Sequence, residues 1–243
     1  MTKKYQLLFL IILPLSLFGQ KGFDISTGTG YSMPFVDISS TQDTNSGFAL
    51  GGYHFNAEGR LMFLNNFGLS FSGNFNEFKL NNDALYKSFY DPANDSSLTI
   101  ENGAWQFKSF ALSPVISFPI TDKFIIFTKF SGTYSISNLP YIKQIVTSKA
   151  GVPYDIIRET AITKAFGAAG GIGFRYFLND HLAIFTAGDF YFSKPDFQLT
   201  GNTHLKYQAS YLNISFGFTY KFVPEEQPSD DEDNKKQQTP FMW

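Results

Sequence analysis

Strict two-residue alternation near the C-terminal end of the chain, between Tyr207 and Phe222, constrains the fold more than any other feature. One set of alternating positions is apolar and mostly aromatic, and the positions between them are polar or small. The apolar positions are Leu212, Ile214, Phe216, Phe218, Tyr220 and Phe222. Because successive side chains of a β-strand point to opposite faces, the stretch predicts a strand with one apolar face. Either a second protein layer or the lipid around a membrane barrel has to cover that face.

The same alternation recurs in seven earlier segments. We predict strands over residues 23–32, 48–64, 67–80, 105–120, 123–137, 161–178 and 181–193. Short turns such as Asn65-Asn66 connect some neighbours, whereas long polar segments, chiefly 81–104 and 138–160, connect others. A membrane barrel has short turns on one side and long loops on the other. The predicted fold class is therefore all-β: an eight-stranded antiparallel transmembrane β-barrel with long extracellular loops and short periplasmic turns. A soluble β-sandwich is the alternative.

The composition favours the membrane reading. Charged residues make up 16% of the chain and aromatic residues 18%, whereas about 25% of a typical soluble domain is charged. A net charge of −2 gives no basic excess for nucleic acid. The absence of cysteine excludes disulfides, thiolate metal sites, cysteine nucleophiles and a lipid-modified cysteine.

The two ends of the chain differ from the barrel region. Residues 1–20 predict a secretory signal peptide, because Lys3 and Lys4 precede an apolar run that ends at Phe18. That run is shorter than the roughly 20 residues that a membrane-spanning helix needs. The barrel is expected over 21–222. Residues 223–243 hold six acidic and two basic residues without strand periodicity, which predicts a disordered acidic tail in the periplasm.

This pattern resembles the small eight-stranded outer-membrane β-barrels of the outer membrane protein A and X type. The phrase GGIGFRYFLNDHLAIFTAGDFYF is similar to the "outer membrane beta-barrel protein" families of Bacteroidota. The resemblance covers roughly residues 21–222 and concerns architecture, since these families share no catalytic motif. It implies an outer-membrane location, contact with outer-membrane lipid or lipopolysaccharide, and insertion by the barrel-assembly machinery. The 21 residues after Phe222 are too few for a peptidoglycan-binding domain, so that partner is not implied.

Charged residues of the predicted strands fall on the face opposite the apolar one. They are Asp24, Glu58, Arg60, Lys129, Arg175, Asp189 and Lys221. We interpret them as a nearly balanced ion-pair network that fills the lumen, because eight strands leave a space that side chains can fill. An ion or proton path is the alternative. Small lumen positions such as Gly28 and Gly173 indicate room for Phe127, Phe185, Arg60 and Tyr191, or else a ligand cavity.

Aromatic residues gather near the predicted strand ends. The outer set is Tyr31, Tyr134, Phe192, Tyr207 and Tyr211, and the inner set is Phe63, Phe67, Phe118, Tyr176, Tyr220 and Phe222. Two such rings are typical of the interfaces of a membrane barrel. The last strand, with Phe218, Tyr220 and Phe222, is expected to close the barrel against residues 23–32 and to resemble a barrel-insertion signal.

Nothing in the sequence indicates catalysis, a cofactor or a metal site. A rim-located lipid-modifying enzyme would need a nucleophile beside a base, and His204 near Asp196 and Thr203 is the nearest candidate. His54 is expected in the lumen, within reach of Asn56 or Glu58. His181 lies beside a short turn.

The function that this pattern favours is a non-enzymatic outer-membrane structural or interaction protein, a class that includes accessory subunits of assembly or secretion complexes. The long loops 81–104 and 138–160 would contact surface partners. The apolar end of the tail, Phe241, Met242 and Trp243, is a candidate docking motif for a periplasmic partner. A small ligand or ion channel is the second hypothesis, and the rim enzyme is the third.

Overall fold

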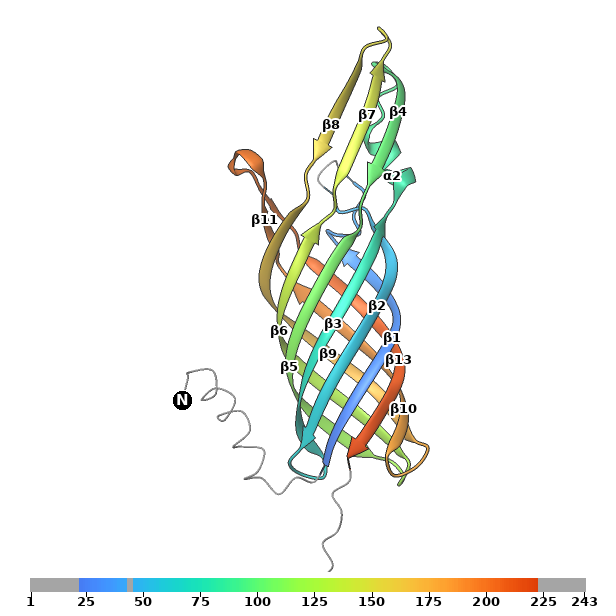
Figure 1. The fold of residues 1–243 in the computed structure, drawn as a ribbon, viewed down its shortest axis with the longest axis vertical. Helices are drawn as coiled ribbons and strands as arrows, with labels where there is room; N and C mark the ends of the chain where they lie inside the picture. The colour runs from blue at the N-terminus through green and yellow to red at the C-terminus, as the bar shows by residue number, and fades with distance from the viewer. Residues whose placement is uncertain (1–21, 43–45, 223–243) are drawn as a thin grey trace, which may run out of the picture.

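The chain forms a closed barrel of eight antiparallel strands in the computed structural model, which describes residues 22–42 and 46–222 (Figure 1). The strands are β1 (Gly22–Val36), β2 (Ala49–Met62), β3 (Phe67–Leu80), β5 (Trp105–Pro119), β6 (Phe124–Leu139), β9 (Ala161–Phe177), β10 (Leu182–Ser193) and β13 (Ala209–Phe222). The predicted fold class is confirmed. The predicted signal peptide and acidic tail lie outside the described residues. Within that described part, no helix is both long and apolar enough to cross a membrane.

The seam of the barrel lies between its first and last strands. β1 pairs with β13 from Phe23 opposite Phe222 to Val36 opposite Ala209, as expected for the closing strand. The row of cross-strand partners that starts at Ser26 of β1 passes once around the wall, from each residue to its partner on the next strand. It returns to β1 at Val36, ten residues further along. A stagger of this kind tilts the strands, and it makes each row of partners climb towards the long-loop end.

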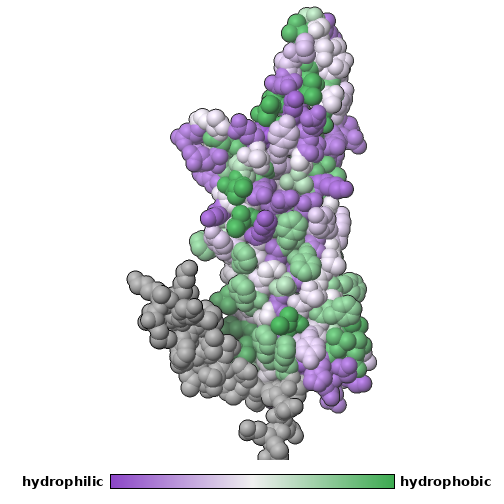
Figure 2. Space-filling model, in the orientation of Figure 1, coloured by the Kyte–Doolittle hydropathy of each residue, from purple (hydrophilic) through white to green (hydrophobic). Residues whose placement is uncertain are grey.

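Alternate residues point outward and form an apolar belt around the wall. Large exposed side chains of this belt include Ile25, Phe71, Phe110, Phe130, Ile172, Phe174 and Phe216. Figure 2 shows apolar residues over the lower half of the barrel and hydrophilic residues above them and at the lowest turns. An apolar surface that encircles the wall is typical of barrels that lipid surrounds.

The long connections are folded, and in this respect the prediction of polar loops was wrong. Residues 81–104 hold helix α2 (Asn82–Phe89) and strand β4 (Asp95–Asn102), and residues 138–160 hold β7 (Ile142–Ser148) and β8 (Pro153–Arg158). The three strands form a sheet in the order β4-β7-β8 that extends beyond the barrel (Figure 1). β11 (Asp196–Gln198), the 3₁₀ turn η1 (Thr200–Asn202) and β12 (His204–Lys206) make a second hairpin. β4 pairs with β7, a segment distant in sequence, which local pattern alone does not reveal.

Candidate functional site

Six of the seven charged residues singled out in the sequence meet inside the lumen. Arg60 Nη2 donates to Glu58 Oε1 at 2.8 Å, and Lys129 Nζ donates to Glu58 Oε2 at 2.9 Å. The same ammonium lies 3.3 Å from Asp189 Oδ1. Arg175 Nη1 donates to Asp24 Oδ2 at 2.8 Å. These six residues, which we call the lumen network, are all buried.

An aromatic ring joins the two halves of the lumen network. The guanidinium carbon of Arg60 lies 4.6 Å from the centroid of the Phe127 ring, and that of Arg175 lies 5.6 Å from it. Three acidic and three basic side chains thus balance one another around a phenyl ring. Pairing of this kind offsets the cost of removing charges from water, and it ties distant strands together.

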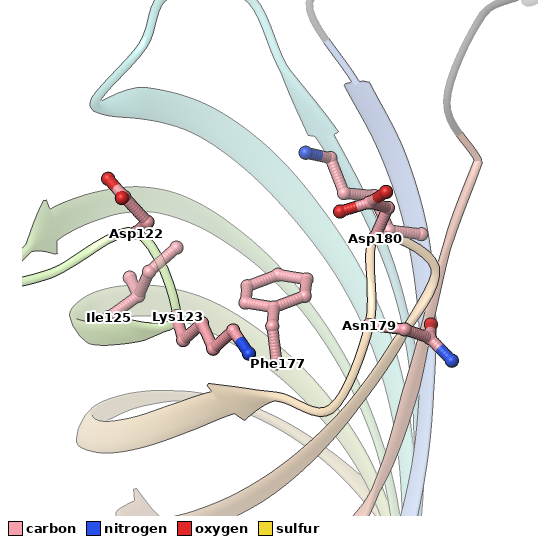
Figure 3. A pocket seen from close by; sticks show the side chains of 7 residues that line it. Asp122, Lys123, Ile125, Phe177, Asn179 and Asp180 are labelled. Carbon is pink, nitrogen blue, oxygen red and sulfur yellow. The ribbon is translucent and has the colours of Figure 1, made fainter.

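Lys221 lies apart from the lumen network, at the short-turn end. Its ammonium is 5.8 Å from the centroid of the Phe177 ring. It lines a shallow pocket at this end of the barrel together with Lys123, Asn179 and Asp180 (Figure 3). Among the described residues, no carboxylate lies within ion-pair distance of Lys221. The seventh predicted member therefore lies outside the network, at the short-turn opening of the barrel, because β13 ends one residue later.

The long-loop end of the lumen is filled by aromatic side chains, a feature that sequence reasoning missed. We define the mouth cluster as Phe78, Trp105, Phe107, Tyr191, Phe197, Tyr207 and Tyr211, all of which are buried. Trp105 stacks on Phe107 at 5.8 Å, and its Nε1 donates to the Gly47 carbonyl at 2.8 Å. Hydrophobic burial and ring stacking therefore close this end of the barrel.

Two members of the mouth cluster correct the predicted outer girdle. Tyr207 and Tyr211 are only 4% and 2% exposed, so they do not face lipid. Tyr211 has the same parity along β13 as Asn213, which points into the lumen. Strand parity therefore overrides the general preference of tyrosine for membrane interfaces. Tyr31, by contrast, is outward and exposed.

A polar layer that includes His54 separates the lumen network from the mouth cluster. His54 Nε2 lies 2.8 Å from Ser215 Oγ on β13, so its partner is neither Asn56 nor Glu58 as the sequence suggested. His54 Nδ1, Asn56 Oδ1 and both amide atoms of Asn76 are buried without a hydrogen-bond partner among the described residues. Buried polar atoms of this kind are commonly satisfied by internal water.

Small residues of the wall make room for large side chains, as predicted. A Cβ atom on Gly173 would lie 2.4 Å from Phe127 Cζ, and one on Gly217 would lie 2.6 Å from Phe185 Cε1. Because real Cβ atoms do not approach so closely, a side chain at Gly173 would require the Phe127 ring to move, and one at Gly217 would also clash with the backbone carbonyl of Thr27. The two phenyl rings thus occupy the space that the glycine-rich faces leave.

The candidate rim histidine is part of a hairpin contact. His204 Nδ1 lies 3.0 Å from Asp196 Oδ1, and Lys206 Nζ lies 3.8 Å from Asp196 Oδ2. All three residues belong to β11 or β12, whose register places Gln198 opposite His204. The contact gives this histidine a carboxylate partner and holds the hairpin together. Elsewhere in the described chain, as here, no group of three or more His, Asp or Glu side chains is placed to hold a metal ion.

The aromatic residues of the closing strand lie on the outer face of the wall. Phe218, Tyr220 and Phe222 are exposed, and the ring of Phe222 stacks on that of Phe23 across the seam at 5.4 Å. Their role in insertion stays a prediction. The candidate docking motif Phe241, Met242 and Trp243 lies outside the described residues.

The sheet β4-β7-β8 at the long-loop end presents an exposed strand at one edge. β8 pairs only with β7, from Ile142 opposite Arg158 to Thr147 opposite Pro153. Tyr154, Ile156 and Ile157 are 44%, 49% and 54% exposed. On the other side of β7, β4 contacts helix α2, where Leu85 is fully buried. Helix α2 begins after Asn81, whose side chain accepts a hydrogen bond from the Ala84 amide at 3.0 Å. Helix α2 therefore contacts the strand at one edge of this sheet, β4, whereas the strand at the other edge, β8, is exposed.

Charged groups hold the outer part of this sheet together. Lys143 Nζ lies 3.1 Å from Asp155 Oδ2, and the hydrogen bond to this carboxylate raises the pKa of Lys143. Tyr154 Oη donates to Asp95 Oδ1 at 3.4 Å, which links β8 to β4. Burial lowers the pKa of Arg158, whose Nε and Nη2 atoms have no hydrogen-bond partner among the described residues.

Of the comparisons with known proteins, only the one with solved structures finds matches. No protein-family model matches the chain, and no curated protein sequence matches it. The chain is similar to Ail of Yersinia pestis, with 15% identity, 84% of this chain and 99% of that chain covered, and a TM-score of 0.44. It is also similar to Neisserial surface protein A, with 14% identity, 84% of this chain and 99% of that chain covered, and a TM-score of 0.43. The outer membrane protein AlkL in lipid bilayers is 10% identical, with 87% of this chain and 95% of that chain covered and a TM-score of 0.48. Likeness at this level carries no argument about the activity of this chain, which has to rest on its own residues.

Proposed function

We propose that this protein is a non-enzymatic outer-membrane β-barrel that presents its extracellular sheet to another protein. The observation that carries the proposal is the contrast between a filled lumen and an exposed edge strand. Buried ion pairs and stacked rings occupy the barrel interior, whereas β8 offers unpaired backbone and apolar side chains above the wall.

The filled lumen argues against the channel hypothesis. The lumen network occupies the lower interior with ion pairs of 2.8 to 3.3 Å. The mouth cluster occupies the upper interior with stacked rings, for example Tyr191 on Tyr211 at 5.1 Å. An eight-stranded barrel has an interior just wide enough for side chains. A solute would have to displace both layers.

The edge strand β8 has the properties of a strand-addition surface. Its outer side carries backbone N–H and C=O groups that no strand of the described chain pairs with. Soluble proteins usually protect such an edge with charged residues, proline or a covering segment. β8 has a proline and a charged residue of this kind, Pro153 and Asp155, but no segment of the described chain pairs with its outer edge, and Tyr154, Ile156 and Ile157 are exposed. An extended peptide segment of a partner can add to such an edge through main-chain hydrogen bonds, with pockets or contacts for alternate side chains.

This role is compatible with an accessory subunit of an outer-membrane assembly or secretion complex. The acidic tail, with Phe241, Met242 and Trp243 at its end, would supply a second contact on the periplasmic side. Insertion of the barrel by the assembly machinery would depend on the closing strand. These finer points are proposals that the resemblance in the sequence supports.

Site-specific crosslinking tests the proposal. A photoreactive amino acid in place of Ile157 should crosslink to one defined protein on intact cells, and the same amino acid in place of Gln198, on the other hairpin, should not. Ile156→Lys in the Ile157-labelled protein should abolish the crosslink while heat-modifiable gel migration shows a folded barrel. Equal crosslinking from both positions, or an unaffected Ile156→Lys variant, would contradict the proposal. Unitary conductance of the wild-type barrel in planar bilayers would favour a channel instead.

A further inference from the structure

Four lysines project outward from the long-loop end of the barrel wall. They are Lys79 on β3, Lys108 on β5, Lys164 on β9 and Lys194 directly after β10, and all four are exposed. None is within ion-pair distance of a carboxylate of the described chain. We call these residues the lysine arc. Because they lie outside the lumen and on the lipid side of the wall, the lumen network does not explain them.

The register brings three members of the lysine arc together, Lys108, Lys164 and Lys194, whereas Lys79 lies one residue beyond the pair of Phe78 and Trp105. Lys108 pairs with Ile136 of β6, and Ile136 pairs with Lys164 of β9, so one row of cross-strand partners contains both lysines. Neighbouring strands lie about 4.8 Å apart, which separates these two Cα atoms by roughly 10 Å. Lys194 directly follows Ser193, the partner of Gly167, so it lies beside the same end of β9. Flexible lysine side chains from these positions can converge on one anionic group.

Each of three lysines has an aromatic residue two positions deeper on the same outward face. The pairs are Lys108 with Phe110, Lys164 with Phe166, and Lys194 with Phe192. The ammonium of Lys194 lies 5.8 Å from the centroid of the Phe192 ring, and the ring of Phe166 lies 5.4 Å from that of Tyr134. Aromatic rings occupy the interface of a bilayer, and lysines extend from its edge towards the headgroups. The lysine arc is therefore at the depth of headgroup phosphates when the belt is in lipid.

The arc covers one side of the barrel only. On β1 and β2 the exposed residues near the same end include Phe35 and Leu50, which are apolar. Glu77, two residues before Lys79 on the same face of β3, accepts a hydrogen bond from Gln106 Nε2 at 3.0 Å. A general requirement for positive charge at the rim would distribute lysines around the whole wall. The uneven arrangement points to a localised binding surface.

We propose that the lysine arc binds the phosphate groups of an anionic lipid headgroup in the outer leaflet, with its acyl chains against Phe110, Phe166 and Phe192. This inference rests on the proposed outer-membrane location and is independent of the edge strand β8. The lysines supply charge-assisted hydrogen bonds to phosphate, and the aromatic rings beneath them contact the upper part of the acyl chains.

Lipid retention in nanodiscs tests the inference. The full-length mature protein is inserted into phosphatidylcholine nanodiscs that contain diphosphoryl lipid A or the same glycolipid without phosphates, and bound lipid is measured by native mass spectrometry. We expect at least tenfold more retention of the phosphorylated form by the wild-type protein. The triple variant Lys108→Gln, Lys164→Gln, Lys194→Gln should lose this preference.

Matched variants and free phosphate define the outcomes. The triple variant Lys87→Gln, Lys123→Gln, Lys149→Gln removes the same charge from helix α2, a short turn and a loop tip, and it should retain the lipid as the wild type does. Added inorganic phosphate should not displace the lipid, because the acyl chains contribute to binding. Equal retention by both triple variants, or no preference for phosphate, would overturn the inference alone. Failure of the wild type to insert into neutral nanodiscs would overturn both the inference and the outer-membrane proposal.

Discussion

Glu58 and Lys129, which are 71 residues apart in the sequence, are joined inside the barrel by a hydrogen bond of 2.9 Å between Nζ and Oε2. They belong to β2 and β6, which are not neighbours in the wall, so the contact crosses the lumen. Both side chains are buried. An ion pair across the interior fixes the spacing of two strands that share no backbone hydrogen bonds.

Removal of one partner of this pair should destabilise the barrel strongly. Lys129→Met leaves the carboxylates of Glu58 and Asp189 with fewer positive neighbours in a buried site, and we expect a loss of about 3–5 kcal/mol. Urea unfolding in lipid vesicles measures the change, and Lys123→Met at a short turn serves as the control. The double variant Glu58→Gln, Lys129→Met should cost clearly less than the sum of the single variants. Strict additivity would contradict the contact.

The mouth cluster predicts a different effect on the two faces of β5. Trp105→Ala removes a fully buried indole and leaves the Gly47 carbonyl without its donor, so we expect a loss of about 3–5 kcal/mol. Phe110→Ala on the outward face of the same strand should cost much less, because lipid replaces the ring contacts. Thermal unfolding followed by gel migration distinguishes the two variants. Similar losses from both would argue against a packed mouth.

Gly173 should tolerate no side chain while Phe127 is present. Gly173→Ala places a Cβ atom 2.4 Å from Phe127 Cζ, and we expect overpacking to cost about 1–3 kcal/mol. Phe127→Leu in the same protein should recover part of that loss. The control is Gly188→Ala, since nothing lies within 4 Å of a Cβ atom at that position. Equal unfolding midpoints for Gly173→Ala and Gly188→Ala would contradict the predicted clash.

The turn between α2 and β4 should be sensitive to acid. The backbone amide of Ala93 and the side-chain amide of Asn94 donate to the Asp91 carboxylate at 2.9 and 2.7 Å, and they lower the pKa of Asp91. A lowered pKa contributes stability that is present above the ordinary value and is lost as the pH falls through the folded value. Asn94→Ala should therefore raise the pKa of Asp91 towards its ordinary value. Carboxyl chemical shifts in an NMR titration measure this, and an unchanged midpoint would refute it.

The closing strand should influence the fraction of protein that folds into the barrel. Phe222→Ala removes the ring that stacks on Phe23 across the seam, a contact worth about 0.5–1.5 kcal/mol in aromatic pairs. We expect a smaller folded fraction after dilution from urea into lipid vesicles. Phe216→Ala, higher on the same outward face, is the comparison. Equal folded fractions for the two variants would argue against a special role of the strand end.

Most of the wall could be predicted because strand alternation is a local property. Each outward residue lies two positions from the next, so the apolar and polar faces of β3, β5 and β13 follow directly from the order of residues. The presence of Asp24, Glu58 and Lys129 on the lumen face followed in the same way. Which carboxylate meets which cation did not follow, because the partners depend on the ten-residue stagger of the closed barrel.

The errors have the same origin. The sequence predicted Tyr211 in the outer girdle, but Tyr211 has the same parity as Asn213 and points inward. Its apolar surroundings there exist only once the mouth cluster is assembled. His54 on β2 contacts Ser215 on β13, across β1, which lies between these two strands in the wall. The contact depends on the closure of the barrel, which places β13 beside β1. The sheet β4-β7-β8 went unpredicted because β4 and β7 pair across a gap that contains two barrel strands.

The amino-acid sequence alone determined that this chain forms strands with one apolar and one polar face, and that these strands suit a lipid-covered barrel. The alternation near Tyr207–Phe222 is sufficient for this, because a period of two residues maps directly onto the two faces of a strand. Only the tertiary structure decided the ion pairs of the lumen, the aromatic closure of the mouth, the exposed edge of β8 and the one-sided lysine arc. Each of these depends on which strands become neighbours and on the stagger between them, and closure of the barrel sets both.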